Sequence, residues 1–586
     1  MYILGLSAYF HDSSVVLLDD DKILFAASEE RFSRLKHDHS FPHNAIQECL
    51  RYTGIQFEEI SEIVFYEKPL LKYERIIETQ IRNFPQSFLQ FLVSTPLWLK
   101  TKLNLRKTLR NEFLRFTETG KVPDIQFSYH HLSHAASAFY PSPFQESAVL
   151  CLDGVGEWST ATMWNGKGNQ IDLIAEIKYP DSLGLFYSAF TSYCGFEINN
   201  GEYKLMGLAS YGKPLYQELI LENIIKVFED GSFKLNQKFF AYNYSDYTFT
   251  KAWEELLGFP AINGESEPEQ KYRDLAASAQ KITEDIIFKM ASTLKEKTGS
   301  ENLCLAGGVA LNCVANGKLA QNNIFKNIWI QPASGDDGGA LGAALSLYYL
   351  KKKAPRDNTQ IKNMMEGSLL GPSYSDDEIK KDLDKYGLKY KTFEYQQELI
   401  KECCKDIMDQ KVIGWFQGRM EYGPRALGGR SIICDPRQSQ MRDIINSKIK
   451  KRELFRPFGP IILEEDLSNY LENPLVSPYM LIVDQAKTNE LAAVVHVDSS
   501  TRYQSLGVGD GRLLRKVLEN LKREYSLSAI INTSFNIKGE PIVCTPDDSL
   551  RCFAETEMDV LYIGNFRIDK VGNNCERVEK PRFMND

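Results

Sequence analysis

The N-terminal part of this 586-residue chain repeats one order of secondary structure. The first copy predicts strands at residues 2–7, 15–18 and 23–27, with a polar loop after the first strand and an Asp-rich turn at 19–21. The second copy predicts strands at 148–152, 159–164 and 171–177, with a turn at 165–168. Apolar runs separated by Asx and Gly turns are typical of hairpins. The duplication, with helices between its halves, predicts two similar α/β lobes that face a cleft.

Such lobes resemble the actin, hexokinase and sugar-kinase superfamily, in which the first hairpin of each lobe wraps a nucleotide's phosphates.

Length and composition narrow the class of protein. A chain of 586 residues is too long for one core and predicts about three to four domain-sized units. No apolar run reaches the roughly 18 residues of a membrane helix, and the first residues predict a strand rather than a signal peptide. We therefore expect a cytoplasmic protein, monomer or homodimer, with no membrane partner. Eleven Cys without a repeated C-x-x-C spacing indicate reduced thiols, and a net charge of −9 argues against nucleic acid as the main partner.

Two histidines suggest a metal site. His130 and His134 lie four residues apart in a run predicted to be helical, so their side chains share one face and could ligate one ion. The alternative is that His131 points outward and the other two are core or capping histidines. Predicted strands also deliver Asp153 and an Asp336-Asp337 pair, of which we favour Asp336 because it comes first after the strand. Two His and two Asp suit iron, zinc or manganese.

Two glycine-rich segments follow predicted strands in the same half. Residues 307–312, GGVALN, lie between an apolar run at 303–305 and a predicted helix. Paired glycines at a helix start can admit a phosphate, although alone they more often form a tight turn. After Gly339, a run of small residues predicts a helix packed closely on its strand. Its first turn would carry Asp336 and Asp337.

The chain loses its apolar periodicity at about residues 351–375. We expect an N-terminal domain at 1–355, a linker at 356–375 and a second α/β domain at 376–586. The second domain predicts strands at 412–416, 479–483, 492–497, 529–532 and 560–563. A helix is expected to begin at Thr545-Pro546, with a cap residue, a first-turn proline and two acids.

The second domain also collects basic and amide side chains in loops rich in glycine, proline and aromatic residues. These candidate ligands are Arg419, Arg425, Arg430, Lys451, Arg452, Arg456, Arg502, Asn532 and Asn536. Guanidinium groups held by rigid backbone recognise phosphates and carboxylates. We favour a phosphate site over the alternative, a structural salt-bridge network.

Taken together, the motifs resemble the O-carbamoyltransferases of the nodulation-factor, cephamycin and tobramycin type over nearly the whole chain. The matching segments are SAYFHDS at 7–13, EERFSRLKH at 29–37, the His130/His134 helix, GEYKLMGLA at 201–209, GGVALN at 307–312, residues 419–430 and NTSFN at 532–536. The resemblance implies a duplicated actin/hexokinase-like N-terminal domain akin to the enzyme that makes threonylcarbamoyladenosine on tRNA. It also implies a YrdC-like C-terminal domain.

The resemblance further implies two half-reactions. The C-terminal domain would convert carbamoyl phosphate and ATP, with Mg²⁺, to carbamoyl adenylate and pyrophosphate. The N-terminal domain would then transfer the carbamoyl group to a hydroxyl of a small natural product or sugar. An Fe²⁺ or similar divalent ion on His130, His134, Asp153 and Asp336 would act as a Lewis acid.

The resemblance also assigns roles to single residues. His11 would be the general base. Lys36 would neutralise the adenylate's charge. The implied nucleotide ligands are Lys36, Asp153, Gly308, Asn312 and Asp336.

Structural roles are the alternative for several of these residues. His11 could only cap the following hairpin, and Lys36 could be a surface charge. Glu202 and Lys204, expected in a polar loop, are candidates for acceptor contact. Three other functions stay open: a small-molecule kinase of the same superfamily, a tRNA-modifying carbamoyl transferase, and a non-catalytic nucleotide-binding protein. AMP formation that needs carbamoyl phosphate would separate the favoured function from a kinase, which would form ADP.

Overall fold

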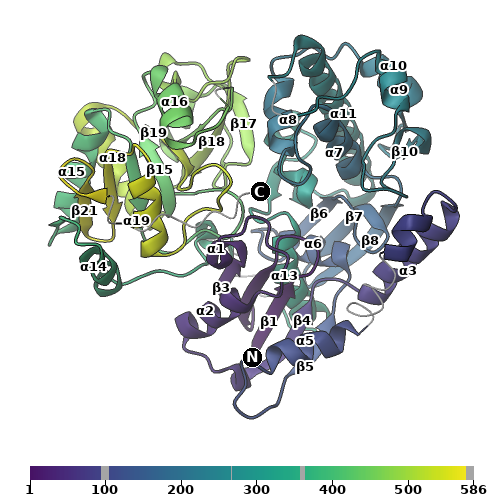
Figure 1. Cartoon of the computed structure of the whole chain (residues 1–586), viewed down its shortest axis with the longest axis horizontal. Coiled ribbons are helices and arrows are strands. Elements are labelled where there is room, and N and C mark those ends of the chain that lie inside the picture. Colours follow the sequence, from purple (N-terminus) through teal and green to yellow (C-terminus); the bar gives the residue numbers. More distant parts are fainter. Residues whose placement is uncertain (94–103, 265–266, 357–362, 454, 576–577, 579–586) are drawn as a thin grey trace. The chain divides into compact units, whose positions relative to one another are not determined.

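The computed structural model describes residues 1–93, 104–264, 267–356, 363–453, 455–575 and 578 (Figure 1). The chain divides into two units. Unit 1 comprises Met1–Leu24 and His39–Met364, and unit 2 comprises Phe25–Asp38 and Met365–Asp586. Among the described residues, no helix has both the length and the apolar character that crossing a membrane requires.

Unit 1 is built on two five-stranded sheets of the same topology. The first sheet has the order β3-β2-β1-β4-β5, and the second has the order β12-β11-β6-β7-β8. The first sheet's strands are β1 (Tyr2–Ser7), β2 (Ser14–Asp19), β3 (Lys22–Ser28), β4 (Ile60–Phe65) and β5 (Asp124–Phe127). The second sheet's are β6 (Glu146–Leu152), β7 (Ser159–Lys167), β8 (Gln170–Lys178), β11 (Asn302–Ala306) and β12 (Asn327–Ile330).

Each sheet has an antiparallel three-strand meander followed by two strands parallel to its first strand. β1 pairs antiparallel with β2 and parallel with β4, as β6 pairs antiparallel with β7 and parallel with β11. The predicted duplication is therefore confirmed, and with it the actin/hexokinase-like fold. One turn lies later than predicted: β7 continues to Lys167, and the chain turns at Gly168, whose φ of 59° suits glycine.

Two helices lie between the sheets. α13 (Asp336–Ser346) packs on β1 and β2, α6 (His130–Phe139) packs on β6 and β11, and the two helices pack against each other. Figure 1 shows this order from β1 through α13 and α6 to β6. The predicted helices at His130 and after Gly335 are thus both present, and the small residues of α13 are buried.

Small residues allow these close contacts. A Cβ added to Gly342 of α13 would lie 1.6 Å from the carbonyl oxygen of Ser133 in α6. A Cβ added to Gly5 of β1 would lie 2.1 Å from the carbonyl oxygen of Ala340. Both positions therefore require glycine, because a backbone oxygen cannot move aside as a flexible side chain can.

The other helices of unit 1 surround this core. They are α2 (His43–Thr53), α3 (Pro69–Arg82), α5 (Leu105–Phe113), α7 (Leu183–Tyr193), α8 (Glu202–Ala209), α9 (Gln217–Asn223), α10 (Ala252–Leu257), α11 (Gln270–Thr298) and α12 (Cys313–Gln321). The short strands β9 (Ile225–Val227) and β10 (Phe233–Leu235) form a separate hairpin.

Unit 2 is built on a nine-stranded mixed sheet of order β13-β21-β20-β14-β15-β19-β16-β18-β17. Its strands are β13 (Lys391–Thr392), β14 (Ile413–Phe416), β15 (Arg430–Cys434), β16 (Gly459–Leu463), β17 (Ile482–Gln485), β18 (Ser500–Leu506), β19 (Ala529–Ser534), β20 (Val560–Ile563) and β21 (Phe566–Asp569). Its helices are α1 (Glu30–Ser33), α14 (Asp376–Lys385), α15 (Gln396–Met408), α16 (Gln440–Ile444), α17 (Leu467–Tyr470), α18 (Leu513–Tyr525) and α19 (Pro546–Glu555). α15 and α18 pack together over the buried core.

The structure confirms most of the elements predicted in unit 2. Strands occur at the predicted positions 413–416, 529–532 and 560–563, and Thr545 caps α19 through a reciprocal bond pattern with Asp548. The strand predicted at 492–497 is wrong, because this run, of which Ala493 and Val494 are buried and Val497 is exposed, forms turns in which Val494 N–H donates to Leu491 O at 2.9 Å. The strand predicted at 479–483 begins only at Ile482, since Met480 has a φ of 57°.

Residues 25–38 belong to unit 2, although they are far in sequence from its main part. Ala26 N–H donates to Leu370 O at 3.0 Å, Arg31 donates to Gly423 O at 2.7 Å, and Arg34 donates to Pro541 O at 2.8 Å. Of the linker expected at 356–375, residues 357–362 lie outside the described residues. The division into domains at 1–355 and 376–586 stays a prediction.

The contact between α6 and α13 makes a stability prediction. Gly342→Ala should lower the free energy of unfolding by about 1–3 kcal/mol or more, because its methyl group overlaps a backbone oxygen. Gly207→Ala in α8 is the matched control, since its Cβ would meet no atom within 4 Å and alanine favours a helix by up to about 1 kcal/mol. Equal denaturation midpoints for the two variants would contradict the packing described here.

Candidate functional site

Four side chains converge in unit 1 where secondary-structure elements begin or end. His130 and His134 lie in the first turns of α6, Asp336 is the first residue of α13, and Asp153 follows β6 directly. α6 follows β5, and α13 follows β12, so the parallel strands of both sheets deliver these residues at their carboxyl ends. In α/β folds this edge is where ligands bind.

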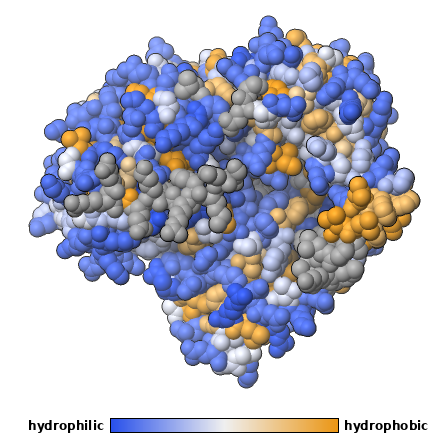
Figure 2. Space-filling view, viewed as in Figure 1, coloured by the Kyte–Doolittle hydropathy of each residue, from blue (hydrophilic) through white to orange (hydrophobic). Residues whose placement is uncertain are grey.

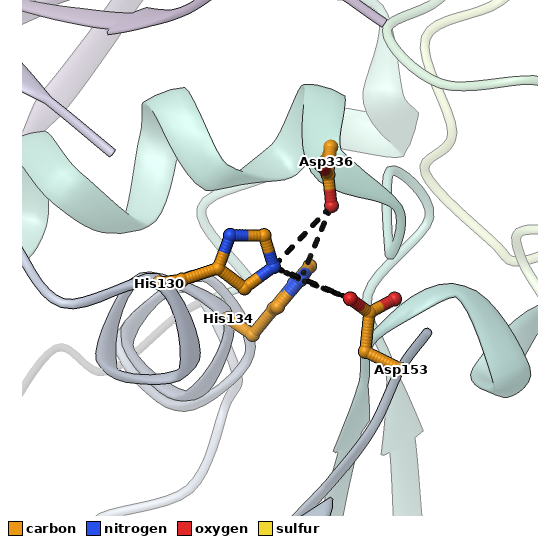
Figure 3. Close-up of side chains that lie close together, drawn as sticks. All are labelled: His130, His134, Asp153 and Asp336. Carbon is orange, nitrogen blue, oxygen red and sulfur yellow. Dashed lines mark hydrogen bonds and ion pairs between the residues drawn. The ribbon is translucent and has the colours of Figure 1, made fainter. Parts of the chain in front are cut away.

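All four side chains are buried and point toward a common centre (Figure 3). His130 Nε2 lies 3.1 Å from His134 Nε2, 3.2 Å from Asp153 Oδ2 and 3.4 Å from Asp336 Oδ1. His134 Nε2 lies 3.8 Å from Asp153 Oδ2 and 3.6 Å from Asp336 Oδ1. One donor atom from each residue lies within 4.8 Å of every other.

These spacings fit a metal ion. Donors that each lie about 2.1 Å from one ion are about 3.0–3.4 Å apart at tetrahedral or right angles. Three of the distances fall in this range and the others exceed it slightly. Two imidazoles and two carboxylates are also a donor set for a divalent transition metal. The residues present therefore fit the predicted ion, and the buried His/Asp cluster could hold it.

The electrostatics of the cluster are strongly coupled. Burial by itself would lower the pKa of His130, but Asp336 and Asp153 raise it to about 9. Burial by itself would raise the pKa of Asp153, but the hydrogen bond with His130 and the charge of His134 hold it well below its usual range. The buried carboxylates are thus stabilised by positive charge at the centre of the cluster, the charge that a metal ion would supply.

The two neighbours of the ligand candidates point elsewhere. His131 is also buried, so the alternative in which it points outward is wrong; its Nδ1 lies 2.9 Å from Thr162 Oγ1, and burial lowers its pKa to about 3. The Asp337 side chain accepts from Gly338 N–H at 3.0 Å instead of joining the cluster. The geometry supports the choice of Asp336.

A second layer of acids surrounds His130. Glu157 accepts the backbone N–H of His130 at 3.0 Å and so caps α6, as well as the N–H of Lys68 at 2.7 Å. Glu67 Oε2 lies 4.0 Å from His130 Nδ1 and forms a buried ion pair with Lys72 at 2.7 Å. Tyr66 donates to Asp336 Oδ2 at 3.3 Å. Sequence reasoning missed these residues, although Tyr66 and Glu67 directly follow β4, the strand beside β1.

His11 lies at the edge of the cluster, in the loop after β1. It is partly exposed, with its Nε2 3.8 Å from Asp336 Oδ2 and its Nδ1 3.3 Å from Asp12 Oδ2. Burial by itself would lower its pKa, but Asp336 and Asp12 raise the pKa to about 9. The structure therefore brings His11 to the metal-ligand candidates.

Gly308 also belongs to this site, whereas Asn312 faces another network. Gly308 N–H donates to Asp153 Oδ1 at 3.0 Å, directly after Gly307, whose φ of 86° requires glycine. Asn312 Oδ1 caps α12 by accepting Ala315 N–H at 3.1 Å, and its amide donates to Gln280 at 2.9 Å. The geometry favours a structural role for Asn312.

Three further predicted residues lie in other parts of the fold. Lys36 is partly buried in a turn of residues 25–38, within unit 2. The loop predicted around Glu202 and Lys204 is wrong, because both lie in the first turn of α8. Glu202 accepts from Ser188 Oγ at 2.6 Å, and the Lys204 ammonium lies 5.7 Å from the ring centre of Phe196.

Unit 2 holds a basic site around a buried lysine that sequence reasoning missed. Lys450 donates to Asn536 Oδ1 at 2.7 Å and to Ser534 Oγ at 3.0 Å, while the predicted Lys451 is exposed. Burial and the charge of Arg452 hold the pKa of Lys450 well below its usual range, and Arg456 contributes in the same direction. Mutually repelling cations around polar acceptors favour an anion ligand.

Two other predicted ligands in unit 2 donate hydrogen bonds to backbone carbonyl groups. Arg430 is fully buried, stacks 3.6 Å above the ring centre of Phe416, and donates to the carbonyls of Cys544, Gln417, Gly418, Gly429 and Pro372. Arg419 donates to Gly371 O at 2.9 Å. This geometry favours a structural role for both residues.

The remaining candidates are more exposed or bridge strands. Arg452 donates to Asn446 Oδ1 at 2.7 Å, Arg456 lies 3.6 Å from Glu453, and Asn532 donates to Ala426 O at 2.8 Å. Arg425 is partly exposed, and Arg502 lies partly buried on β18. Glu421, which accepts three backbone N–H groups of residues 427–430, was also missed; it is the buried acid that orders this loop.

Comparison with known proteins assigns the chain to a family. The family model described as "Carbamoyltransferase N-terminus" matches residues 2–345, and that described as "Carbamoyltransferase C-terminus" matches residues 404–570. The chain belongs to the carbamoyltransferase family. The resemblance seen in the sequence is thereby confirmed, and the chain is an enzyme that transfers carbamoyl groups. The family assignment leaves the kinase and the non-catalytic alternatives without support.

Relatives of this carbamoyltransferase cover nearly its whole length. Nodulation protein NolNO of Sinorhizobium fredii is 36% identical over 96% of this chain and 80% of its own. Protein sll1178 of Synechocystis is 45% identical over 97% of both chains, and nodulation protein U of S. fredii is 26% identical over 90% of this chain and 92% of its own. Among solved structures, component A of (R)-2-hydroxyglutaryl-CoA dehydratase from Acidaminococcus fermentans covers 60% of this chain and 98% of its own, with a TM-score of 0.33 and 16% identity.

The cluster predicts metal binding by named residues. His134→Ala should leave the purified protein with little bound divalent metal, because one of four buried donors is lost. The measurement is elemental analysis after loading and desalting, with circular dichroism to confirm folding. His131→Asn is the matched control on the same helix, since it can keep the contact with Thr162 and removes no cluster donor. Full metal content in the His134 variant, or equal loss in both, would refute the assignment.

The position of Glu67 beside His130 predicts that Glu67 strengthens metal binding. The single variant Glu67→Gln is a poor test, because it leaves Lys72 charged and buried without its partner and should destabilise the fold by about 3–5 kcal/mol. The double variant Glu67→Gln/Lys72→Met removes both charges, and its metal affinity should fall by about 10–100-fold, as when other outer carboxylates are lost. Competition with a chelator measures this affinity. An unchanged affinity in a folded double variant would show that Glu67 does not orient His130.

Proposed function

We propose that this carbamoyltransferase uses ATP to activate carbamoyl phosphate in unit 2 and transfers the carbamoyl group to a hydroxyl of a small-molecule acceptor in unit 1. The observation that carries the proposal is the presence of two chemically different sites in one carbamoyltransferase chain. One is a buried cluster of two His and two Asp, and the other is a cationic site around Lys450. A tRNA acceptor is disfavoured by the net charge of −9.

Activation is required because carbamate is a poor acyl donor. Its charge and its nitrogen both deactivate the carbonyl carbon, so it needs a good leaving group. Carbamoyl phosphate would first lose its phosphate to water, and the carbamate oxygen would then attack the α-phosphorus of ATP. The products are carbamoyl adenylate, pyrophosphate and inorganic phosphate. The reactants and pyrophosphate are polyanions, which explains why a cationic site would serve this step.

Lys450, Arg452 and Arg456 are the proposed anion ligands of unit 2. Ser534 and Asn536 hold the Lys450 ammonium by two side-chain oxygens, which keeps its position fixed at the end of β19. An anion close to Lys450 would also favour the charged form of this lysine and so restore its pKa toward the usual range. Mg²⁺ is expected to accompany ATP. The other basic residues of residues 419–430 are proposed to shape this site, with Arg430 holding the loop.

Transfer is proposed at the cluster in unit 1. A divalent ion such as Fe²⁺ on His130, His134, Asp153 and Asp336 would supply Lewis-acid stabilisation of the carbamoyl or phosphate oxygens. Gly308 N–H is positioned beside Asp153, at the glycine turn where a phosphate could approach. Lys36, Glu202, Lys204 and Asn312 stay proposals for binding of adenylate, acceptor and nucleotide.

His11 is the proposed general base. It is the partly exposed histidine at the edge of the cluster, so an acceptor hydroxyl can reach it more easily than it can reach buried His130. As a base His11 must lose the proton that Asp336 and Asp12 stabilise. The pull of Asp336 on that proton weakens when its carboxylate is shared with a cation. The deprotonated acceptor oxygen would then attack the carbamoyl carbon, and AMP would leave.

The proposal predicts that the two half-reactions separate by variant. His11→Asn should still release pyrophosphate from ATP and carbamoyl phosphate, but transfer to an accepted alcohol should slow by about 10²–10⁴-fold. Arg452→Ala should instead reduce pyrophosphate release itself, because it removes a charge beside Lys450. Both measurements use the full chain, since residues 25–38 are part of unit 2.

A control histidine variant is measured in the same assay. His43→Asn, a partly exposed histidine paired with Glu112, should change neither half-reaction. If His11→Asn abolishes pyrophosphate release and transfer equally, His11 does not act as the acceptor's base. ADP formation in place of AMP and pyrophosphate would refute activation as an adenylate.

A further inference from the structure

The inner face of α3 is polar, which is the reverse of an ordinary surface helix. The residues that α3 buries are Lys72, Arg75 and Gln80, while Leu70 and Ile81 near its ends are exposed. Figure 2 shows apolar side chains as an orange area at the right of the molecule, over α3. A helix at a protein surface normally turns its apolar residues inward, because their burial stabilises the fold. The buried charges of α3 therefore need a reason other than packing.

Arg75 is a buried cation without a hydrogen-bond partner. The neighbouring Lys72 forms an ion pair with Glu67 at 2.7 Å, whereas Arg75, 6% exposed, has its guanidinium 4.9 Å from the ring centre of Tyr179. In the part of the chain that the structure describes, Arg75 donates no hydrogen bond and joins no ion pair, and its Nε is fully enclosed without an acceptor. A charged group that has lost water without gaining a hydrogen bond costs free energy, and a ligand that supplies acceptors would remove this cost.

Two other buried arginines show the contacts of a structural guanidinium. Arg356 in unit 1 lies 4.5 Å from the ring centre of Phe139 and donates to four carbonyl groups at 2.9–3.2 Å. Arg430 in unit 2 lies over Phe416 and donates to five carbonyl groups. Arg75 shares their burial and their aromatic neighbour but has none of their hydrogen bonds. Its donors are therefore left for a bound group rather than used to hold the fold.

Arg75 lies close to the acids that contact His130. The charges of Glu67 and Glu157 both act on its guanidinium. Glu67 Oε2 lies 4.0 Å from His130 Nδ1, and Glu157 accepts the backbone N–H of His130 at 3.0 Å. The other ring nitrogen of His130, Nε2, lies 3.2 Å from Asp153 in the cluster. Arg75 is thus associated with the Nδ1 edge of His130, whereas the other metal-ligand candidates meet its Nε2 edge.

A second series of contacts leads from α3 to His11. Lys72 and Arg75 are three residues apart, so their side chains lie on one face of the helix. The Lys72 ammonium lies 3.7 Å from the ring centre of Phe10, and the rings of Phe10 and His11 are 4.4 Å apart. The buried face of α3 therefore approaches the histidine that we propose as the base for the acceptor hydroxyl.

The chemistry of the guanidinium defines the class of ligand. A planar guanidinium beside an aromatic ring presents its N–H edge to a carboxylate or phosphate, which it can bind through two parallel hydrogen bonds. We propose that Arg75 binds the carboxylate or phosphate of an acidic acceptor whose hydroxyl faces His11. The inference rests on the proposed function in that transfer takes place at the cluster. The phosphate of the nucleotide is proposed elsewhere, at the glycine turn of Gly308 beside Asp153.

Arg75→Met tests the site in the full-length protein loaded with divalent metal. Its urea midpoint should fall less than that of Arg356→Met, the matched control, which loses four hydrogen bonds. Inorganic phosphate should raise the midpoint of the wild type and of Arg356→Met more than that of Arg75→Met, because a ligand of the folded state stabilises it. Phosphate bound around Lys450 or by the metal ion adds equally to all three proteins. An equal rise in all three, or equal destabilisation by the two variants, would overturn the proposal.

Two further ligands distinguish the acceptor from the nucleotide. AMP, the nucleotide released by transfer, should bind the wild type and Arg75→Met with the same affinity in calorimetry. An accepted alcohol that carries a carboxylate should have its KM raised by about 10–100-fold in Arg75→Met with kcat little changed, because charge-assisted hydrogen bonds are lost. A neutral alcohol should keep its KM. Weaker binding of AMP by the variant, or an equal change of KM for both alcohols, would overturn the assignment to the acceptor.

Pyrophosphate release separates failure of this inference from failure of the proposed function. If the wild type forms no AMP and pyrophosphate from ATP and carbamoyl phosphate, the proposed function fails, while the phosphate measurement still decides whether Arg75 binds an anion. If pyrophosphate is released but phosphate stabilises the wild type and Arg75→Met equally, only the inference fails.

Discussion

The contact between α6 and α13 is the constraint on which the site in unit 1 depends. Gly342 leaves room for the Ser133 carbonyl oxygen, and Gly5 leaves room for Ala340, so the two helices and the first sheet approach at backbone distance. Because both helices begin at the same edge of the fold, this contact brings His130 and His134 to Asp336. Asp153 joins them because β6 ends beneath α6. A wider spacing between the helices would separate the donor atoms beyond reach of one ion.

The burial that orders the cluster also removes its charged groups from water, which costs free energy. Buried carboxylates and imidazoles are stable only when charge and hydrogen bonds compensate the loss of water. In unit 1 the compensation comes from opposite charges within the cluster and from Glu157, Glu67 and Lys72 around it. In unit 2 the imbalance is the opposite one, because Lys450 is buried beside Arg452 and its ammonium is held only by neutral oxygens. The first site is suited to a cation, and the second is suited to an anion.

Sequence reasoning was most successful where one residue type and one period determine the structure. The i, i+4 spacing of His130 and His134 placed both on one helix face, and the strand before Asp153 placed that carboxylate at a sheet edge. It failed where local signals were ambiguous. Lys451 was chosen from a basic run, but the π-turn at the end of α16 buries Lys450 instead. Glu202 and Lys204 looked like loop residues because polar side chains and Gly201 mask the start of α8. The largely apolar run at 492–497 has the composition of a strand, but it forms turns.

The sequence by itself determined the duplicated α/β lobes, the histidine pair, the carbamoyltransferase motifs and the basic character of the C-terminal part. These follow from periodicity and residue chemistry, which act over a few neighbouring positions. Only the tertiary structure decided that Asp336 rather than Asp337 meets the histidines, that Glu67 and Lys72 lie behind them, and that residues 25–38 belong to unit 2. It also showed that Arg430 is enclosed by backbone carbonyls. Such outcomes depend on contacts between residues far apart in the chain, and no local pattern specifies which of two adjacent side chains faces a partner that arrives from a distant segment.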